Sequence, residues 1–492
     1  MLFNSIEFAI FLPIVFVLYW FVTNKNLKLQ NILLLVASYV FYGWWDWRFL
    51  SLVFVSSLVD YIIGINIEKT EKKLNRKILL FASLFVNLGF LGFFKYYNFF
   101  VDSFIDAFSF FGMQFQARTL NIVLPVGISF YTFQTLSYTL DIYKHRLKPT
   151  EDIIAFFSFV SFFPQLVAGP IERASNLLPQ FTKKRKFDLL QAKDGMRQIL
   201  WGLFKKIVIA DNAATFVNEI FEKSDTMPGS TLFIAAILFA FQIYGDFSGY
   251  SDIAIGTARL FGFKLMRNFA FPYFSKDMAE FWRTWHISLS TWLRDYLFLP
   301  TAYWTMNKIK NPKFLSIKAE VWGYVVGISF TWFLGGLWHG AKWTFVLWGC
   351  LHGLYLVVSH ITKKFRKKTL RKLKIKKKNP VLVFIQTIGT FFLVTIAWVL
   401  FRAENVGQAF SIFNTILSES FFETPNLKGK VLLSGIFIIF LVVFEYIQRK
   451  KEHALEIQKW NLIFRWSFYF FVLFIGVFFG NFNEVEFIYF QF

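Results

Sequence analysis

Two histidines, His339 and His352, lie in a stretch that is otherwise almost wholly apolar, aromatic or glycine, FLGGLWHGAKWTFVLWGCLHG (333–353). An ionisable side chain within a hydrophobic segment is costly and is by default a functional candidate. An imidazole can act as a general base, taking the proton from an acceptor hydroxyl as that hydroxyl attacks an activated acyl group. Acyl transfer with His339 as the base is one chemistry open to this stretch. The alternative is a neutral imidazole that only hydrogen-bonds a neighbouring helix.

The spacing of the two histidines restricts how they act together. On one uninterrupted helix, His339 and His352 would be separated by about 20 Å and by about 220° of rotation. They cannot form a catalytic dyad unless the chain turns between them. Glycines on both sides of His339, at 335, 336 and 340, predict a helix break there. We expect the two histidines to act at different depths or in different roles.

Other catalytic signatures are missing from the sequence. It contains no Gly-x-Ser-x-Gly elbow, no His-Glu-x-x-His pair and no glycine-rich phosphate loop. A thioester donor carries a good leaving group, so one base in an oriented, dry site is sufficient. No metal site is expected, because no second ligand lies at a suitable spacing from His339. The single cysteine, Cys350, excludes an intrachain disulfide. His145, His360 and His453 lie near charged residues at helix ends, and we expect them to be solvated.

Residues 281–300, FWRTWHISLSTWLRDYLFLP, separate into two faces when read as one helix. One face carries the polar residues Arg283, His286, Ser290 and Arg294. The opposite face carries Trp282, Trp285, Leu289, Trp292 and Tyr296. From this stripe alone, an interfacial helix with arginines among lipid headgroups is favoured. The alternative is a vestibule for an anionic or phosphorylated donor.

The composition is typical of a membrane protein. The 492-residue chain is 56% hydrophobic and only 17% charged, less charge than a soluble chain of this length would show. At about 20 residues per crossing, its apolar runs predict roughly ten to thirteen spanning or half-spanning helices. These runs lack the alternation of a barrel strand, so the expected fold class is an all-α, polytopic helical bundle. The first run, from 7 to 22, has no cleavage site and predicts a retained helix.

The net charge of +22 is concentrated in loops beside the apolar runs. Such loops favour a cytoplasmic topology signal over nucleic-acid binding, so no nucleic acid is expected as a partner. The basic loops are 69–77, 183–186, 363–378 and 449–451.

Two apolar runs are interrupted and predict broken helices. All basic loops can lie on the cytoplasmic side only if the segment 161–172 does not cross the membrane. We therefore expect this segment to be re-entrant. Two aspartates and three glycines interrupt the run 243–256, where we expect a second break, and the two breaks together imply an internal cavity. No internal repeat supports the inverted-repeat transporter pattern. We expect one multi-pass domain, 1–492, with a core at about 120–360 and flanking helices in 1–119 and 380–492.

Six motifs give the chain a specific resemblance. They are LPVGISFYTFQTLSYTLDIY (124–143), FFPQLVAGPIER (162–173), YGDFSGYSDIAIG (244–256), FWRTWHISLSTWLRDYLFLP (281–300), LWHGAKWTFVLWGCLHG (337–353) and the terminal FIYFQF. In this order they resemble the membrane-bound O-acyltransferase (MBOAT) family, and within it the bacterial branch typified by the alginate O-acetylation protein AlgI. The match runs nearly end to end.

The resemblance implies a fold and a set of site residues. Members have a funnel or tunnel through the bilayer, re-entrant segments and an intramembrane catalytic histidine, which corresponds to His339. His352 corresponds to the second family histidine and would position or relay. The resemblance also favours the cavity role for the stripe in 281–300. The residues expected to shape the donor vestibule are Asp246, Arg283, His286, Ser290 and Arg294, with Asp252 and Asp295 as partners for the arginines.

The resemblance also implies an activity. Relatives take acetyl from a cytoplasmic thioester, with acetyl-CoA as the expected donor and no permanently bound cofactor. An SGNH-type extracytoplasmic acetyltransferase with a Ser-Asp-His site is the expected partner, and it places the group on a polysaccharide such as alginate or peptidoglycan. The expected location is the bacterial inner membrane, in contact with membrane lipid. A D-alanyl transferase serving teichoic acid from a carrier protein and a non-enzymatic transporter are the alternatives.

Overall fold

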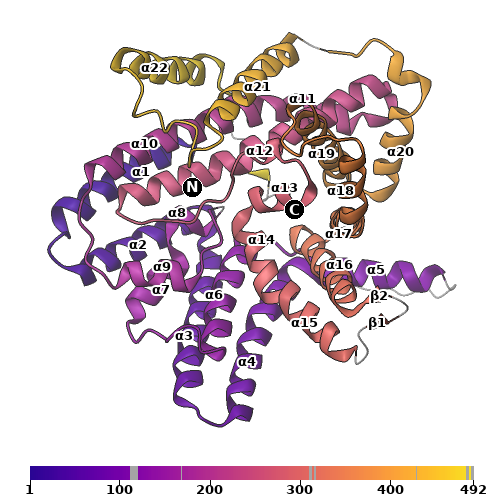
Figure 1. The fold of residues 1–492 in the computed structure, drawn as a ribbon. Helices are drawn as coiled ribbons and strands as arrows, with labels where there is room; N and C mark the ends of the chain where they lie inside the picture. Colours follow the sequence, from indigo (N-terminus) through magenta and orange to yellow (C-terminus); the bar gives the residue numbers. More distant parts are fainter. Residues whose placement is uncertain are drawn as a thin grey trace. The chain divides into compact units, whose positions relative to one another are not determined.

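The chain is built almost entirely of helices (Figure 1). In the computed structural model, the described residues are 1–110, 120–167, 169–309, 313–314, 317–427, 429–483 and 487–488. Within these ranges the strands are β1 (Lys313–Phe314) and β2 (Ile317–Lys318), which pair antiparallel. The all-α class expected from the apolar runs is confirmed.

The chain divides into two compact units. The first comprises Met1–Leu203 and Tyr250–Met266, and the second comprises Phe204–Gly249 and Arg267–Phe492. The long helix α12 (Gly229–Leu260) contributes residues up to Gly249 to the second unit and the following residues to the first.

The first unit packs its helices around buried polar contacts. Within it, α3 and α4 both pack against α6, and Asp60 of α3 accepts hydrogen bonds from Ser83 and Asn87 of α4 at 2.6 and 2.8 Å. The helices of this unit are α1 (Ile6–Val17), α2 (Leu27–Asp46), α3 (Leu50–Lys69), α4 (Lys73–Leu91), α5 (Tyr97–Phe110), α6 (Ile128–Tyr143), α7 (Ile153–Ser161), α8 (Phe163–Leu166), α9 (Ala174–Phe181) and α10 (Leu189–Leu203).

The second unit contains both histidines of interest. Its most extensive helix pairing joins α16 and α17, which lie side by side in Figure 1. In addition to the first part of α12, its helices are α11 (Asp211–Glu222), α13 (Met278–Thr284), α14 (Ile287–Leu293), α15 (Leu299–Lys308), α16 (Ala319–His339), α17 (Trp343–Ile361), α18 (Lys363–Lys372), α19 (Pro380–Arg402), α20 (Val406–Ile416), α21 (Gly429–Gln448) and α22 (Leu462–Phe479).

Many of these helices are long and apolar enough to cross a bilayer. In the part of the chain that the structure describes, eight helical segments meet this criterion, and two shorter apolar ones, Ile6–Val22 and Ile153–Leu166, accompany them. On α22, Phe464, Phe470 and Phe478 are exposed, as suits a surface that faces hydrocarbon. The chain is a multi-pass membrane protein.

The predicted interruption at 161–172 is confirmed as a break in the helix. Helix α7 ends at Ser161, α8 lasts for one turn, and α9 begins only at Ala174. Gln165 in the break is buried and donates a hydrogen bond to the Gln134 side chain of α6 at 2.8 Å. Ala168 lies outside the described residues, and the re-entrant placement stays a prediction.

Glu172 closes this interruption as a buried carboxyl. Its side chain accepts hydrogen bonds from the Met266 backbone N–H and from the Asn176 amide. Burial raises the pKa of Glu172 from 4.5 to about 7, against the lowering effect of those two hydrogen bonds.

We expect this carboxyl to make the protein less stable as the pH rises from about 4.5 to about 7. Because the folded pKa lies above the unfolded one, the folded state binds more protons in that window, so stability falls with rising pH. The full effect would reach about 3 kcal/mol. Unfolding midpoints of the detergent-solubilised chain between pH 5 and pH 8 measure it. The Glu172→Gln variant should show a flatter profile, and an unchanged slope in that variant would contradict the assignment.

The second predicted break, at 243–256, is wrong, because α12 continues through it. Its glycines serve close packing rather than a kink. A Cβ on Gly245 would lie 2.9 Å from the Lys205 carbonyl oxygen, and one on Gly256 would lie 2.5 Å from that of Gly195. Asp246 has a lysine partner and Asp252 accepts a hydrogen bond from Gln198 at 2.7 Å, so their polar groups do not interrupt the helix.

Candidate functional site

The chain turns between the two histidines. Helix α16 ends at His339, Gly340 follows with extended backbone, and α17 begins at Trp343. The predicted break is therefore confirmed at Gly340, whereas Gly336 stays helical. Glycines allow the two helices to approach closely: a Cβ on Gly336 would overlap the Phe345 carbonyl, and one on Gly349 would overlap the Trp332 carbonyl.

This turn brings both imidazoles onto one indole ring. His339 is 3% exposed and lies edge-on to Trp348, with ring centroids 4.7 Å apart. His352 is fully buried and contacts the same indole at 4.8 Å. Trp338 and Phe401 complete the surroundings of His339, at 4.9 and 5.4 Å. We call His339, His352, Trp282, Trp338 and Trp348 the histidine–tryptophan cluster.

The second histidine has a defined tautomer. The Trp282 indole N–H donates to Nδ1 of His352 at 3.3 Å. An indole nitrogen can only donate, so Nδ1 must accept and the ring proton of the neutral imidazole sits on Nε2. Nε2 is buried, and no atom of the described residues hydrogen-bonds it. His352 is therefore arranged as a hydrogen-bond donor through Nε2 rather than as a base.

We expect Trp282→Phe to lower the rate of acyl transfer about tenfold, because a buried hydrogen bond worth about 1–2 kcal/mol is lost and the imidazole can then adopt either tautomer. The measurement is transfer rate per membrane-inserted protein. Trp332→Phe is the matched control, since Trp332 contacts the same imidazole at 5.8 Å without supplying this hydrogen bond. Equal losses in both variants would mean that ring packing, not the donor, matters.

The interpretation of 281–300 as one helix with a polar stripe is wrong. Helix α13 ends at Thr284, and His286 adopts a left-handed backbone with φ 42° before α14 begins. Asn268 holds this turn: its Oδ1 lies 3.1 Å from Nδ1 of His286 and accepts from the Ser288 hydroxyl at 2.9 Å. His286 is fully buried, and burial lowers its pKa to about 3, so it is neutral.

His286 nevertheless lies beside the histidine–tryptophan cluster. Its ring contacts Trp338 at 6.0 Å and Phe247 at 4.5 Å. Trp338 thus lies between His286 and His339, as Trp348 lies between His339 and His352. The three predicted histidines come together, although the predicted helix does not.

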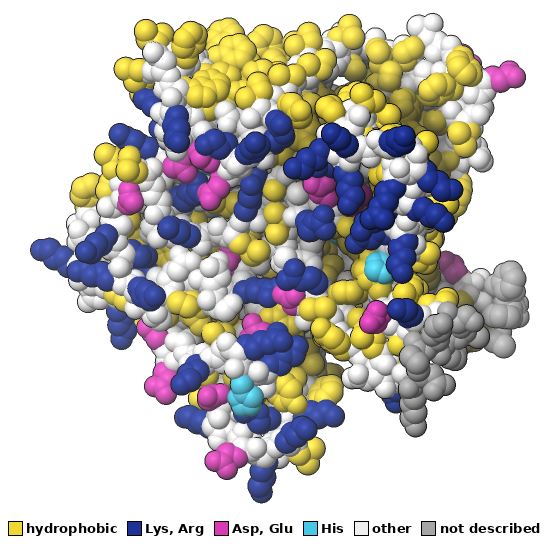
Figure 2. Space-filling view, viewed as in Figure 1, with side chains coloured by type: hydrophobic (Ala, Val, Ile, Leu, Met, Phe, Trp, Pro, Cys, Tyr) yellow, Lys and Arg dark blue, Asp and Glu magenta, His cyan; other side chains and the backbone are white. Residues whose placement is uncertain are grey.

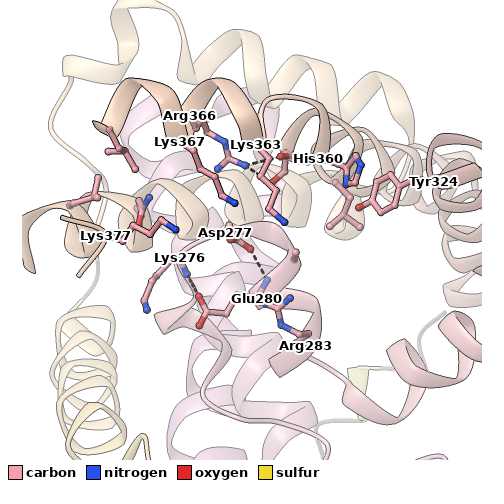
Figure 3. A pocket seen from close by; sticks show the side chains of 16 residues that line it. Lys276, Asp277, Glu280, Arg283, Tyr324, His360, Lys363, Arg366, Lys367 and Lys377 are labelled. Carbon is pink, nitrogen blue, oxygen red and sulfur yellow. Dashed lines mark hydrogen bonds between the residues drawn. The ribbon is translucent and has the colours of Figure 1, made fainter. Parts of the chain in front are cut away.

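The other members of the predicted stripe lie elsewhere. Arg294 is exposed and pairs with Asp295 at 2.7 Å, as expected for that pair. Ser290 is half-buried, and its hydroxyl donates to the Trp285 carbonyl at 3.2 Å. Arg283 lines a cavity of about 390 Å³, which we call the basic pocket (Figure 3). Six Lys and Arg side chains line this pocket: Lys276, Arg283, Lys363, Arg366, Lys367 and Lys377.

Asp246 forms part of a buried ionic cluster. The Lys206 ammonium lies 2.8 Å from the carboxylates of both Asp211 and Asp246, and all three residues are buried. Asp246 also accepts the Ile488 backbone N–H at 2.7 Å, which fixes this residue to α12. Burial lowers the pKa of Lys206, but the two carboxylates outweigh it and raise the pKa overall. Burial and the nearby Asp246 raise the pKa of Asp211. The donor role of Asp246 stays a prediction.

Several residues around the two histidines were not predicted from the sequence. No site role is predicted for Trp282, Trp338 or Trp348, although Trp348 lies four positions before His352 and shares a helix face with it. The expectation of a solvated His453 is also wrong, since it is 2% exposed. His145 and His360 are exposed, as expected. Within the described ranges, no three His, Cys, Asp or Glu side chains gather as metal ligands.

Comparison with known proteins decides the family. The sequence model of the membrane-bound O-acyltransferase family (MBOAT) matches residues 150–400, which include the whole histidine–tryptophan cluster. The chain belongs to this family. As a member of the MBOAT family, it is an acyltransferase.

Individual relatives agree with this assignment over most of the chain. The probable alginate O-acetylase AlgI of Pseudomonas aeruginosa is 37% identical over 445 residues, 90% of this chain and 80% of the relative. The peptidoglycan O-acetyltransferase of Helicobacter pylori is 34% identical over 490 residues, 92% and 85% of the two chains. The teichoic acid D-alanyltransferase of Bacillus subtilis is 28% identical over 256 residues, 50% of this chain and 62% of the relative. The resemblance to the AlgI branch is confirmed.

Proposed function

We propose that this protein transfers an acetyl group from acetyl-CoA on the cytoplasmic side of a bacterial inner membrane toward a hydroxyl of a cell-surface polysaccharide. The observation that carries the proposal is the placement of two buried histidines on the single indole of Trp348. Relatives named for O-acetylation of alginate and of peptidoglycan cover about nine-tenths of the chain, whereas D-alanyl transferases match about half of it.

The chemistry divides between the two histidines. His339 takes the proton of the acceptor hydroxyl as its oxygen bonds to the thioester carbonyl carbon. His352 donates its Nε2 proton in a hydrogen bond to the carbonyl oxygen, where negative charge develops. When the carbon–sulfur bond breaks, the proton held by His339 passes to the thiolate, and the histidine returns to its neutral form. The Trp282 hydrogen bond to the other nitrogen of His352 supports this role.

The aromatic surroundings support transfer to a hydroxyl rather than to water. Trp338, Trp348 and Phe401 pack around His339, so the imidazole is shielded from bulk solvent. Exclusion of water from an active site limits hydrolysis of a reactive acyl donor. We propose that the acceptor hydroxyl is the serine of an extracytoplasmic SGNH-type acetyltransferase, whose Ser-Asp-His site then places the acetyl group on the polymer.

Radiolabelled acetyl-CoA offered to inverted membrane vesicles tests the donor. We expect label to accumulate in the vesicle lumen, bound as ester to polymer or to the partner protein, and to fall to background in vesicles carrying His339→Asn. Vesicles that retain no label from acetyl-CoA, but acquire label from an aminoacylated carrier protein, would replace this proposal with the D-alanyl alternative.

A further inference from the structure

The basic pocket carries a large excess of positive charge. Beside its six Lys and Arg side chains, its acidic lining residues are Asp277 and Glu280. Both carboxylates already accept backbone hydrogen bonds: Asp277 caps α13 by accepting the Glu280 N–H at 2.8 Å, and Glu280 accepts the Lys276 N–H at 2.9 Å (Figure 3). The cationic groups therefore exceed the local acids, and the pocket is suited to an anion of more than one charge.

One cation of the pocket is held in a fixed direction. The Arg366 guanidinium donates to the carbonyl and the hydroxyl of Ser359 at 2.7 and 3.0 Å (Figure 3). Arg366 belongs to α18, which begins directly after the membrane-spanning α17 and has the sequence KKFRKKTLRK. Figure 2 shows Lys and Arg side chains gathered densely over this part of the second unit. A polybasic segment next to a membrane span attracts anionic lipid headgroups.

An apolar groove adjoins the basic pocket. It has a volume of about 1020 Å³ and shares Lys276 and Glu280 with the pocket, so the two spaces adjoin at these residues. Its walls come from α19 and α21, both long and apolar enough to span a membrane, and from the segment 270–275. The apolar wall residues include Val383, Phe384 and Phe391 of α19 and Val442, Val443 and Tyr446 of α21. A second cation, Arg449, lies at this groove and stacks on Tyr446 at 4.0 Å.

A ligand that fills both spaces must join phosphate-like negative charge to hydrocarbon. We propose that an anionic phospholipid binds here, with its phosphate among Lys276, Lys363 and Arg366 and its acyl chains in the apolar groove. A soluble phosphorylated molecule shares the phosphate chemistry but leaves the groove unfilled, and the position of Lys276 at the border of both spaces favours the lipid. The bound lipid is not consumed in the acyl transfer proposed above.

Native mass spectrometry of the full-length protein in detergent, titrated with phosphatidylglycerol or phosphatidylcholine, tests this site. We expect phosphatidylglycerol to bind at least tenfold more tightly. The paired substitution Lys276→Gln with Arg366→Gln should remove that preference, and Val383→Trp, which fills the groove, should weaken phosphatidylglycerol at least tenfold. Lys223→Gln is the control, because Lys223 is an exposed lysine that pairs with Glu219 away from both spaces.

Two results would overturn the proposal. Equal affinity for the two lipids in the native protein would remove the role of the cations. The second result has two parts: inorganic pyrophosphate binds the native protein and the Val383→Trp variant equally, and Val383→Trp leaves the lipid affinity unchanged. Together they would show a site for soluble phosphates instead. Melting temperatures of all variants within a few degrees of the native protein confirm that the comparison concerns folded chains. Failure here leaves the acetyl-CoA vesicle assay unaffected, so the two proposals stand or fall independently.

Discussion

Replacing His339 with Asn should lower the rate of acetyl transfer by about 10²–10⁴-fold, because a positioned general base contributes that much to proton transfer in the transition state. The His339 imidazole packs among Trp338, Trp348 and Phe401, and an amide in its place has no basic nitrogen. The measurement is polysaccharide O-acetyl content, together with acetyl transfer in vesicles. Protein abundance in the membrane is determined for each variant.

The matched control is His145→Asn. His145 is exposed, and its backbone is left-handed with φ 55°, a conformation that Asn tolerates. We expect normal acetylation from this variant. Full acetylation by His339→Asn at normal abundance would show that His339 is a satisfied core histidine, and the acyl-transfer chemistry would have to start from another group.

His352 provides a graded comparison within the same site. If its Nε2–H stabilises the developing oxyanion, His352→Leu, which has no donor, should cost about 10²–10³-fold in the rate, since a single oxyanion donor has about that value. Because both histidines pack on Trp348 and act on one transition state, the double variant should lose far less than the product of the two single losses. Multiplicative losses would mean that they serve separate steps.

Those parts of the site that depend on local chain geometry could be predicted from the sequence. Gly340 has an extended backbone, so α16 ends at His339 and the next helix, α17, begins at Trp343. The prolines and glycine of 161–172 likewise interrupt the helix where expected. The membrane class follows from composition alone, and the eight apolar segments agree with it. The choice of His339 as the catalytic candidate came from the family motifs, because residue spacing alone does not distinguish it from His352.

Those parts that depend on distant partners could not be predicted. Periodicity gives 281–300 as one helix, but Asn268 captures the turn at His286 through its side-chain oxygen, and no local pattern contains that contact. Similarly, the two aspartates in 243–256 favour a helix break when the sequence is considered alone, because it does not show which residues pair with them. Lys206, forty positions before Asp246, supplies the compensating charge, and α12 continues. The basic loop 363–378 was expected to act as a topology signal, but it also lines the basic pocket. This role could not be predicted, because the other wall of the pocket comes from α13, which lies far from α18 in the sequence.

Lys206→Met should destabilise the protein by about 3–5 kcal/mol, since removal of one partner leaves buried charge without compensation. Asp211 and Asp246 would then share a site with no cation, and both are buried. The measurement is the denaturant midpoint of the detergent-solubilised chain. Lys223→Met is the control, because Lys223 is a lysine whose side chain is 56% exposed and pairs with Glu219 at 3.5 Å. Its removal should change stability by less than about 1 kcal/mol.

The same cluster decides between two roles for Asp246. If the residue is structural, Asp246→Asn weakens the hold on Lys206 and on the Ile488 N–H, so stability and acetylation should fall together with the KM for acetyl-CoA unchanged. The neutral combination of Lys206→Met with Asp211→Asn and Asp246→Asn should then recover much of the lost stability, because no buried charge remains. A donor-binding role gives the opposite split: KM for acetyl-CoA rises while the unfolding midpoint stays constant. That result would return Asp246 to the donor vestibule, whereas a joint fall would assign it to the buried ionic cluster that holds Ile488.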